Sequence, residues 1–560
     1  MTSILGISAF YHDSAAALII DGEIISAAQE ERFSRIKHDS QYPFHAIEFV
    51  LKNSNLKLSQ IDHIVFFEKP FLKFERLLET HLAFAPFGFK SFLMSMPIWL
   101  KEKLFQKKFL FDKLCQHDID FKDIKKINFS EHHFSHAASA FYPSPFNDAA
   151  ILTLDGVGEW ATTTIAEGKE NDIKIKKEIH FPHSIGLLYS AFTYYTGFRV
   201  NSGEYKLMGL APYGKSIYKK KILDNLIDLK EDGSFRLNMK YFDFATGLTM
   251  TNSKFSELFG EDVRNPEKNK LTQFHMDIAA SIQEATEEIV LKIVKYISKN
   301  TKSKNLCLAG GVALNCVANG KILRKNYFKK IWIQPAAGDA GGSLGAALAY
   351  WYLELKKQRK ISLFNDGMKG SYLGPSYNND IIKETLTKLD AIFEEKKEDE
   401  LISLVANSLN DGKIIGWFQG RMEFGPRALG ARSIIADPRS TKMQKELNLK
   451  IKFRESFRPF APSILREDLK DWFDLNFDSP YMLLVSKVAK NIQIEMSEKD
   501  KKLFGIEKLN IKRSEIPAVT HIDYTSRIQT VHKETNLRYH KLLKKFKELT
   551  GCPILVNTSF

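Results

Sequence analysis

Two stretches of the chain share one pattern, ILGISAFYHDSAAALIIDG at positions 4–22 and AILTLDGVGEWATTTIA at positions 150–166. Each starts with a short apolar run, passes through a polar turn that contains an aspartate, and continues with a second apolar run. Short apolar runs on both sides of a tight turn with Asp and Gly are typical of two strands joined by that turn. The sequence therefore predicts a strand-turn-strand unit that occurs twice.

The small residues of these turns indicate what the turns bind. Glycine, alanine and serine let backbone N–H groups come close to an anion. Actin-like and sugar-kinase-like ATPases present two loops of this kind to the phosphates of a nucleotide. We therefore expect an α/β protein with a two-lobed actin-like (ASKHA) domain in its N-terminal part.

Two later segments strengthen this prediction. Asn305–Ala309 has the pattern of a strand that leads through a Gly-Gly turn at Gly310 into a helix. Ile331–Ile333 is followed by small residues at 335–343 that open a helix through Tyr350. Glycines between a strand and a helix place backbone amides and the positive end of the helix beside a ligand. Ligands of doubly wound sheets lie beyond the carboxyl ends of the strands, so we expect Asp155, Gly310 and Asp339 near a ligand.

The composition of the 560 residues, 44% hydrophobic and 26% charged, excludes a disordered, collagen-like or coiled-coil chain. Four cysteines, none in a CxxC pair, exclude a disulfide scaffold or a zinc ribbon and favour the reducing cytoplasm. The 81 Lys and Arg residues exceed the 67 Asp and Glu residues and give a net charge of +14. That charge is compatible with binding to nucleic acid, an anionic membrane or phosphorylated small molecules.

The longest apolar stretch is Leu82–Leu100, which is interrupted by Pro86, Lys90 and Pro97. A membrane-spanning helix needs about 20 continuous apolar residues. We therefore expect no membrane span and interpret the stretch as an amphipathic helical insertion or lid, with a helix on a membrane surface as the alternative. The N-terminus lacks the basic and apolar regions of a signal peptide.

A histidine-rich stretch, EHHFSHAASA at positions 131–140, has the spacing of a metal site. The alanine-rich continuation predicts a helix, and residues four apart lie on one helix face, so His132 and His136 can bind one ion. His133 with His136 is the alternative pair, and hydrogen-bonded structural histidines are a third interpretation. With Asp155 and Asp339, the first pair would form an N/O site suited to Fe(II), Mn(II) or Zn(II). No HExxH motif occurs, which excludes a zincin protease.

The first turn contains His12, which can act as a general base for an alcohol because an imidazole titrates near neutral pH. The alternative is a turn histidine that bonds to the backbone. Lys37, in the charged segment EERFSRIKHD at positions 30–39, can reach a phosphate. The alternative for that segment is a solvated helix end.

The C-terminal part carries arginines among glycines and prolines. Positions 419–433 are QGRMEFGPRALGARS, and further arginines are Arg454, Arg458 and Arg527. Arginines on rigid irregular loops suit bidentate capture of a phosphate or carboxylate, and a basic surface is the alternative. No helix-turn-helix, RRM or KH pattern supports a nucleic-acid interface. The charged and polar segment 356–380 is typical of a linker, so we predict domains at 1–355 and 381–560.

Five motifs occur in a fixed order: HHFSHAASAF at 132–141, LDGVGE at 154–159, GGVALN at 310–315, RMEFGPRALG at 421–430 and CPILVNTSF at 552–560. Together they resemble the NodU/CmcH O-carbamoyltransferase family, whose members act in antibiotic and nodulation-factor biosynthesis. The match runs from the first strand to the last residue. The arginine loop and the histidine stretch are its specific parts.

The resemblance implies a two-step chemistry in two domains. A C-terminal YrdC-like α/β domain would form carbamoyl adenylate from carbamoyl phosphate and ATP, with Mg²⁺ accompanying the ATP. The actin-like, threonylcarbamoyltransferase-like domain would pass the carbamoyl group to a hydroxyl of a sugar-containing or other small metabolite. The residues that match the family's Fe(II) site, or a site for another divalent metal, are His132, His136, Asp155 and Asp339. The other implied roles are a general base at His12, adenylate contacts at Lys37, Gly310, Gly311 and Asn315, and carbamoyl phosphate and ATP contacts at Arg421, Arg454, Arg458 and Arg527.

Members of the family run on beyond the point where this chain ends, so we expect the C-terminal domain to lack a strand or a helix. Two other functions stay as alternatives. One is a tRNA-modifying threonylcarbamoyl-type transferase, which the net charge would favour, and the other is a non-catalytic nucleotide-binding module. The domain order and the arginine loop favour a small-molecule acceptor and no nucleic-acid partner, with a homodimer as one option for the subunit state.

Overall fold

Both strand-turn-strand units form strands in the computed structural model, which describes residues 1–100, 105–361 and 366–560. The first strand-turn-strand pattern folds into three consecutive antiparallel strands, β1 (Ser3–Ser8), β2 (Ala15–Ile20) and β3 (Glu23–Gln29). The second folds in the same way into β6 (Asp148–Leu154), β7 (Ala161–Lys169) and β8 (Asp172–His180). The pattern of apolar runs and turns therefore predicted both hairpins.

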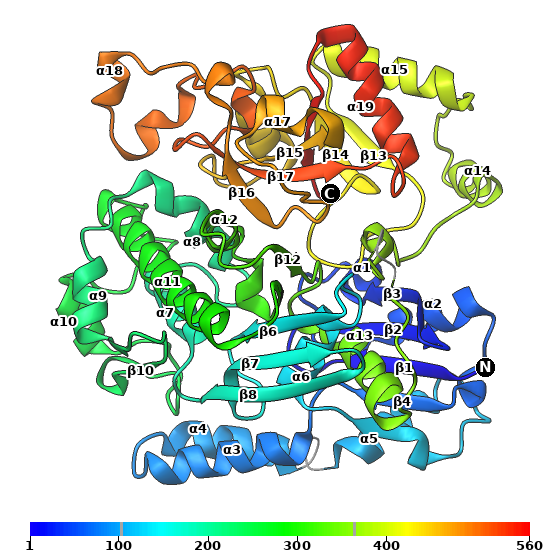
Figure 1. Ribbon diagram of the computed structural model, residues 1–560, viewed down its shortest axis with the longest axis vertical. Helices are drawn as coiled ribbons and strands as arrows, with labels where there is room; N and C mark the ends of the chain where they lie inside the picture. Colours follow the sequence, from blue (N-terminus) through cyan, green and yellow to red (C-terminus); the bar gives the residue numbers. More distant parts are fainter. Residues whose placement is uncertain (101–104, 362–365) are drawn as a thin grey trace. The chain divides into compact units, whose positions relative to one another are not determined.

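Each hairpin is extended by two parallel strands into a five-stranded sheet (Figure 1). The first sheet has the order β3-β2-β1-β4-β5, and β4 (His63–Phe66) and β5 (Ile127–Phe129) continue it from β1. The second sheet has the equivalent order β8-β7-β6-β11-β12, and β11 (Asn305–Ala309) and β12 (Lys330–Ile333) continue it from β6. This duplication is the arrangement of an actin-like domain and confirms the predicted fold class.

Two buried helices pack tightly against each other in this part of the chain. They are α6 (His132–Phe141) and α13 (Asp339–Ala349), and every residue of α13 is buried. A Cβ atom at Gly345 of α13 would lie 1.8 Å from the carbonyl oxygen of Ser135 in α6, so only glycine permits this approach. The close contact places the first residue of α13 near the histidines of α6.

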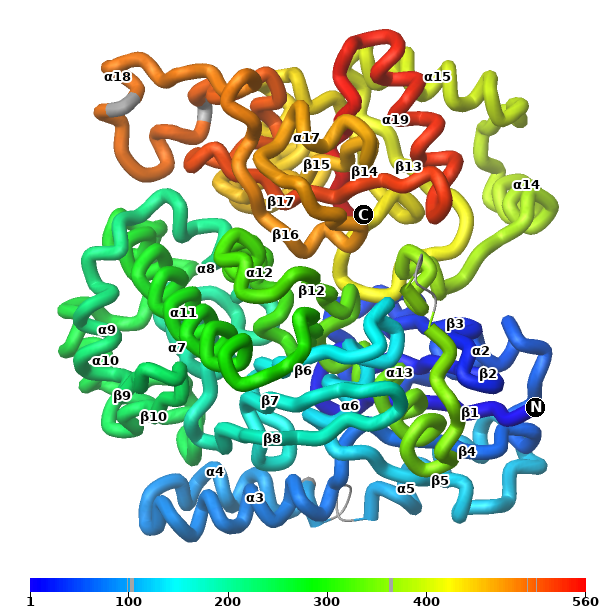
Figure 2. The backbone as a smooth tube through the Cα atoms, in the orientation of Figure 1, coloured from blue at the N-terminus to red at the C-terminus, as the bar shows by residue number. Residues whose placement is uncertain are grey.

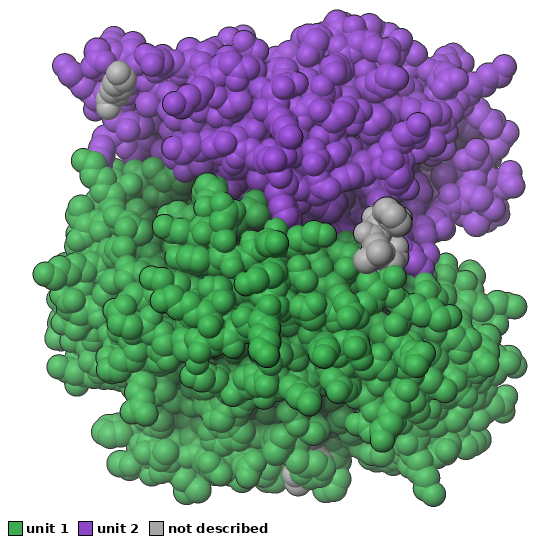
Figure 3. All heavy atoms as spheres, in the orientation of Figure 1, with its two compact units in different colours: residues 1–367 green, residues 368–560 purple. Residues whose placement is uncertain are grey.

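The chain divides into two units, Met1–Gly367 and Met368–Phe560 (Figure 3). The boundary falls inside the segment 356–380 that we predicted as a linker, of which residues 362–365 lie outside the described residues. Arg359 in that segment is anchored to the first unit, because its guanidinium donates hydrogen bonds to the carbonyl oxygens of Phe141, Tyr142, Ser144 and Phe146.

Helices and two short strands complete the first unit. The remaining elements are α1 (Glu31–Ser34), α2 (Phe44–Ser54), α3 (Pro70–Ala83), α4 (Phe89–Ile98), α5 (Gln106–Leu114), α7 (Ile185–Tyr195), α8 (Glu204–Leu210), α9 (Lys219–Asn225), β9 (Ile227–Leu229), β10 (Phe235–Leu237), α10 (Ser253–Phe259), α11 (Gln273–Asn300) and α12 (Cys316–Arg324). Figure 2 shows the long helix α11, which packs against α7, α8, α9 and α12.

The apolar stretch Leu82–Leu100 contributes the end of α3 and the whole of α4, so the helical part of that prediction agrees with the structure. Among the described residues, no helix combines the length and apolarity needed to cross a membrane.

The second unit is a mixed α/β fold around a six-stranded sheet of order β13-β14-β18-β15-β17-β16. Helices α15 and α19 pack against each other, and β18 lies between β14 and β15. The elements are α14 (Asn379–Lys388), α15 (Glu398–Asn410), β13 (Ile415–Phe418), β14 (Arg432–Ala436), α16 (Met443–Glu446), β15 (Ala461–Leu465), α17 (Leu469–Trp472), β16 (Leu484–Lys487), α18 (Glu498–Lys501), β17 (Thr525–Val531), α19 (Leu537–Thr550) and β18 (Ile554–Thr558). The likeness of this unit to a YrdC-type domain stays a prediction.

Candidate functional site

Two histidines and two aspartates meet in the interior of the first unit. One ligand atom each from His132, His136, Asp155 and Asp339 can be chosen so that all four lie within 4.8 Å of one another. The Nε2 atom of His132 is 3.0 Å from Oδ2 of Asp155, and the Nε2 atom of His136 is 3.7 Å from both Oδ2 of Asp155 and Oδ1 of Asp339. The structure therefore brings together the four residues that the sequence placed in one site.

Three elements position these side chains. His132 and His136 lie one helical turn apart on α6, Asp155 follows β6, and Asp339 is the first residue of α13. Glu159 holds the start of α6, because its carboxylate oxygens accept hydrogen bonds of 3.0 Å from the backbone N–H of His132. Glu159 lies inside the LDGVGE motif, but local sequence patterns predict no role for it.

The four side chains fit a bound cation. All are at most 9% exposed, and neither carboxylate oxygen of Asp339 accepts a hydrogen bond from a described residue. A buried carboxylate without a hydrogen bond is costly, and the Nε2 atoms of His132 and His136 lie only 3.1 Å apart. A divalent cation would satisfy these atoms, and two imidazole nitrogens with carboxylate oxygens suit Fe(II), Mn(II) or Zn(II).

The charges of the cluster shift one another's pKa values. Burial opposes a charge on His136, but Asp155 and Asp339 outweigh it and raise the pKa of His136 to about 9. Burial alone would raise the pKa of the Asp155 carboxyl, but its contacts with His132 and His136 hold that pKa well below its ordinary value. Both carboxylates therefore stay ionised at neutral pH, as metal ligation requires.

The alternative histidine pair is not formed. The Nδ1 atom of His133 lies 2.8 Å from the hydroxyl oxygen of Thr153, and burial lowers the pKa of His133 well below 6.5. His133 is thus a neutral, hydrogen-bonded residue on another face of α6. Sequence spacing left both pairs open, and the position of β6 decides between them.

His12 lies beside the four-residue cluster. Its Nε2 atom is 3.7 Å from Oδ2 of Asp339, and its Nδ1 atom is 3.1 Å from Oδ2 of Asp13. Burial opposes protonation of His12, but Asp339 and Asp13 together raise its pKa to about 9. The other oxygen of Asp13 lies 2.8 Å from Nδ1 of His38. Asp13, which had no predicted role, therefore contacts the predicted base, and His38 is linked to that base through Asp13.

The Gly-Gly turn is joined to the same cluster. The backbone N–H of Gly311 donates a 3.0 Å hydrogen bond to Oδ1 of Asp155. Gly310 has a φ of 86°, and a Cβ atom there would lie 2.3 Å from the carbonyl oxygen of Leu154, so the turn requires glycine. Asn315 caps α12 by accepting a hydrogen bond from the backbone N–H of Ala318.

Lys37, the remaining predicted adenylate contact, is held by a tyrosine from another part of the first unit. Its Nζ atom donates a 2.8 Å hydrogen bond to the hydroxyl oxygen of Tyr205 in α8.

Two arginines of the second unit help to shape the loop around the RMEFGPRALG motif. Arg421 and Arg432 donate to backbone carbonyl oxygens, those of Leu373 and Gly374 for Arg421 and those of Pro375, Gln419, Gly420 and Ala431 for Arg432. Oε1 of Glu423 accepts hydrogen bonds from the backbone N–H groups of Leu429, Ala431 and Arg432. The RMEFGPRALG motif therefore contains side chains that shape its own loop.

A groove of about 430 Å³ in the second unit contains one predicted site residue, Arg421, together with Gln419 and Arg538. The other three predicted arginines lie elsewhere in this unit. The Nε atom of Arg454 donates a 2.7 Å hydrogen bond to Oδ1 of Asn448, the guanidinium of Arg458 lies 3.4 Å from Glu455, and Arg527 is part of β17.

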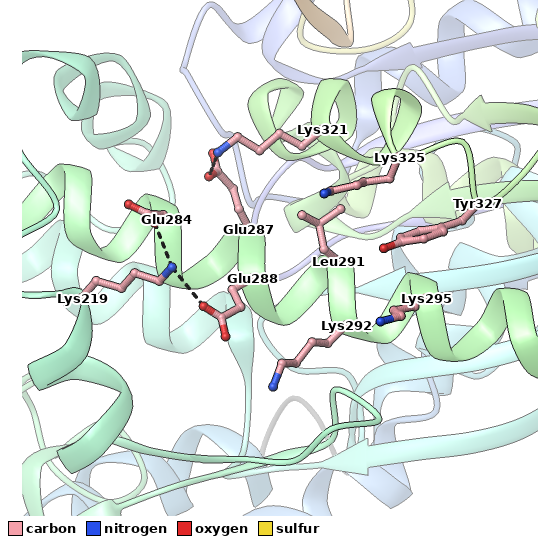
Figure 4. A pocket seen from close by; sticks show the side chains of 10 residues that line it. All are labelled: Lys219, Glu284, Glu287, Glu288, Leu291, Lys292, Lys295, Lys321, Lys325 and Tyr327. Atoms are coloured by element: carbon pink, nitrogen blue, oxygen red, sulfur yellow. Dashed lines mark hydrogen bonds and ion pairs between the residues drawn. The ribbon is translucent and has the colours of Figure 1, made fainter.

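A second groove, of about 350 Å³, lies on the first unit along α11 and α12 (Figure 4). It contains none of the predicted site residues. Its three glutamates pair with two of its lysines, Lys219 with Glu284 at 2.8 Å and Glu288 at 3.0 Å, and Lys321 with Glu287. Ion pairs of this kind are typical of solvated helix faces.

Comparison with known proteins shows the family to which the chain belongs. Models described as the N-terminus and the C-terminus of carbamoyltransferases match residues 3–348 and 406–560. An uncharacterized protein, sll1178 of Synechocystis sp., is 58% identical over 100% of this chain and 91% of its own length. Nodulation protein NolNO of Sinorhizobium fredii is 37% identical over 98% of this chain and 74% of its own length. The chain therefore belongs to the carbamoyltransferase family, as its five motifs predicted.

Proposed function

We propose that the protein is an ATP-dependent O-carbamoyltransferase of the cytoplasm. The second unit forms carbamoyl adenylate from carbamoyl phosphate and ATP, and the first unit transfers the carbamoyl group to a hydroxyl of a sugar-containing or other small metabolite. The observation that supports the proposal most is the buried cluster of two histidines and two aspartates with His12 beside it, in a chain of the carbamoyltransferase family.

We assign Fe(II), or another divalent metal, to His132, His136, Asp155 and Asp339. When bound there, such an ion supplies Lewis-acid polarisation of the carbamoyl carbonyl group. With the ion bound, Asp155 and Asp339 would be neutralised, and the charge of Asp339 is the largest single contribution that raises the pKa of His12. The neutral form of His12, which a general base requires, is thereby favoured.

In the transfer step, Nε2 of His12 accepts the proton of the acceptor hydroxyl. The hydroxyl oxygen forms a bond to the carbamoyl carbon, and the bond from that carbon to the phosphate oxygen breaks, so that AMP leaves. Gly310, Gly311 and Asn315, with Lys37, hold the adenylate. The N–H groups of Gly310 and Gly311 already donate to Ala337 and Asp155. The part of this turn that suits the phosphate is therefore the positive N-terminal end of α12, directly after Asn315.

In the first step, we assign the carbamoyl phosphate and ATP contacts to Arg421, Arg454, Arg458 and Arg527, with Mg²⁺ accompanying the ATP. A carbamoyl adenylate reacts with water, so passing it on within the protein protects it. The acceptor is a small molecule rather than a nucleic acid, and the subunits form homodimers.

Incubation of the iron-loaded protein with ATP and carbamoyl phosphate tests the proposal. We expect carbamoyl adenylate, pyrophosphate and phosphate, measured by ³¹P NMR and mass spectrometry. A folded, metal-loaded sample that forms none of these three products would instead indicate a non-catalytic nucleotide-binding module. Tight, steeply salt-dependent binding of tRNA would indicate a tRNA-modifying transferase.

A further inference from the structure

One carboxylate joins two histidines next to the four-residue cluster. Oδ2 of Asp13 lies 3.1 Å from Nδ1 of His12, and Oδ1 of Asp13 lies 2.8 Å from Nδ1 of His38. These side chains are only partly exposed, at 21% for His12, 19% for Asp13 and 27% for His38. The order His38, Asp13, His12 and then Asp339 leads from the edge of the site to the cluster.

The chemistry of the carboxylate determines where the imidazole protons lie. An ionised carboxylate only accepts hydrogen bonds, so Nδ1 of both His12 and His38 must carry hydrogen. Burial opposes ionisation of Asp13, but its hydrogen bonds with His12 and His38 hold its pKa far below the ordinary value. Neutral His12 is therefore confined to the tautomer whose Nε2 is unprotonated, and this nitrogen points toward Asp339.

The backbone around this chain of contacts is strained and tightly held. Asp13 and His38 both have positive φ values, 53° and 55°, which non-glycine residues rarely adopt. Backbone hydrogen bonds of 2.9 Å, from Phe10 N–H to the Ser40 oxygen and from Ser14 N–H to the Asp39 oxygen, tie the two loops together. Such strain persists where the surroundings impose it, and it is common at functional sites.

We propose that Asp13 and His38 are positioning residues for His12, with Asp13 fixing its tautomer and ring orientation and His38 holding Asp13 in place. This inference rests on the proposed role of His12 as the general base. An equivalent carboxylate in serine proteases keeps the catalytic histidine in its working tautomer. His38 adds a second hydrogen bond, which prevents the Asp13 carboxylate from rotating away.

The first test observes the tautomer directly and needs no acceptor. Protein labelled with ¹⁵N-histidine and loaded with diamagnetic Zn(II) is studied by NMR, and the His12 signals are assigned by their loss in His12→Gln. We expect the Nδ1–H tautomer of His12 in the parent protein. Asp13→Asn, which offers one acceptor in place of two, should produce a mixture of tautomers. Parent-like His12 signals in Asp13→Asn would overturn the proposal.

The second test measures turnover of synthetic carbamoyl adenylate with water as the acceptor. Glycine and asparagine both tolerate a positive φ, so His38→Gly and His38→Asn form a matched pair. The asparagine amide nitrogen replaces Nδ1 of the imidazole as a donor, whereas glycine removes the donor. We expect His38→Gly to lower kcat about tenfold at unchanged KM and Zn(II) content, and His38→Asn to recover most of it.

A double-mutant comparison separates this inference from the proposed function. In a His12→Ala background, His38→Gly should cause no further loss, because positioning residues act only through the base. If His12→Ala lowers kcat but neither Asp13→Asn nor His38→Gly changes it, the positioning role is wrong and the base assignment stands. If His12→Ala itself leaves kcat unchanged, both the assignment of His12 as the general base and the positioning role are wrong.

Discussion

The histidine motif of the first unit and the arginine motif of the second unit are both specific to the family, yet they use their polar groups differently. In the first, the Nε2 atoms of His132 and His136 converge, and the carboxylate of Asp339 lacks a hydrogen-bonding partner among the described residues. In the second, Arg432 and Glu423 bond to the backbone of their own loop and of the segment before it, whereas Arg421 bonds to that segment and also lines the groove. A buried polar group without a protein partner indicates a ligand, whereas a satisfied one indicates a role in holding the loop.

The strongest test of this comparison removes one group of the first motif. His136→Ala should lower carbamoyl transfer by about a thousandfold or more, because the cluster loses a ligand and its metal. Adenylate formation, followed as pyrophosphate release, should stay near the parent rate. Metal content measured by mass spectrometry provides the control, and equal loss of both steps would contradict the division of labour between the two units.

Arg421→Ala should produce the opposite pattern. We expect adenylate formation to fall by about 10- to 100-fold, while transfer from supplied carbamoyl adenylate continues. The matched variant Arg421→Lys keeps the charge but loses the planar fork of donors, so it distinguishes a charge effect from the shaping of the loop. If the variant lost only carbamoyl transfer, the assignment of Arg421 to adenylate formation would be wrong.

Arg432→Ala tests whether the satisfied polar groups of the arginine motif stabilise the loop. Its guanidinium is buried, donates to four backbone carbonyl oxygens and lies 3.5 Å from the ring centre of Phe418. Removing it breaks these four hydrogen bonds and the contact with the Phe418 ring, although Pro375 and Ala431 still accept hydrogen bonds from backbone N–H groups. The free energy of unfolding should therefore fall by about 2–4 kcal/mol. Urea denaturation measures this change, and a variant at the exposed Lys442 is the control. Loss of adenylate formation without loss of stability would instead indicate a ligand contact.

The pH dependence of the metal-free protein tests the charge balance of the cluster. The pKa of His136 is raised to about 9 in the folded chain, above the unfolded value of 6.5. Protonated His136 therefore stabilises the fold below about pH 6.5, and this contribution disappears as the pH rises through 9. Urea denaturation in EDTA should show stability falling across that window. Metal binding should tighten over the same window because it displaces protons, and a pH-independent affinity would contradict this.

The smallest effect is expected at the groove between α11 and α12. Lys219→Ala removes partly exposed ion pairs with Glu284 and Glu288. Such pairs contribute about 0–1 kcal/mol, so the unfolding free energy and both reaction steps should stay close to those of the parent. A strong loss of activity would show that this groove, which lacks every motif residue, takes part in function.

The sequence by itself determined the elements that local patterns encode. Apolar runs around Asp-containing turns predicted both hairpins, and the Gly-Gly turn predicted the connection from β11 to α12. The spacing of His132 and His136 predicted that they share a helix face, because a helix places residues four apart above one another. The five motifs together identified the family and therefore the four residues of the cluster.

Only the tertiary structure decided which side chains meet. Asp155 and Asp339 are far apart in the sequence, and they converge because the duplicated sheets bring the end of β6 and the start of α13 to the same place. The same packing excludes His133, uses Glu159 to hold α6, and joins His38 through Asp13 to His12. Local patterns cannot show such contacts, since they depend on how closely α6 and α13 approach, which Gly345 permits.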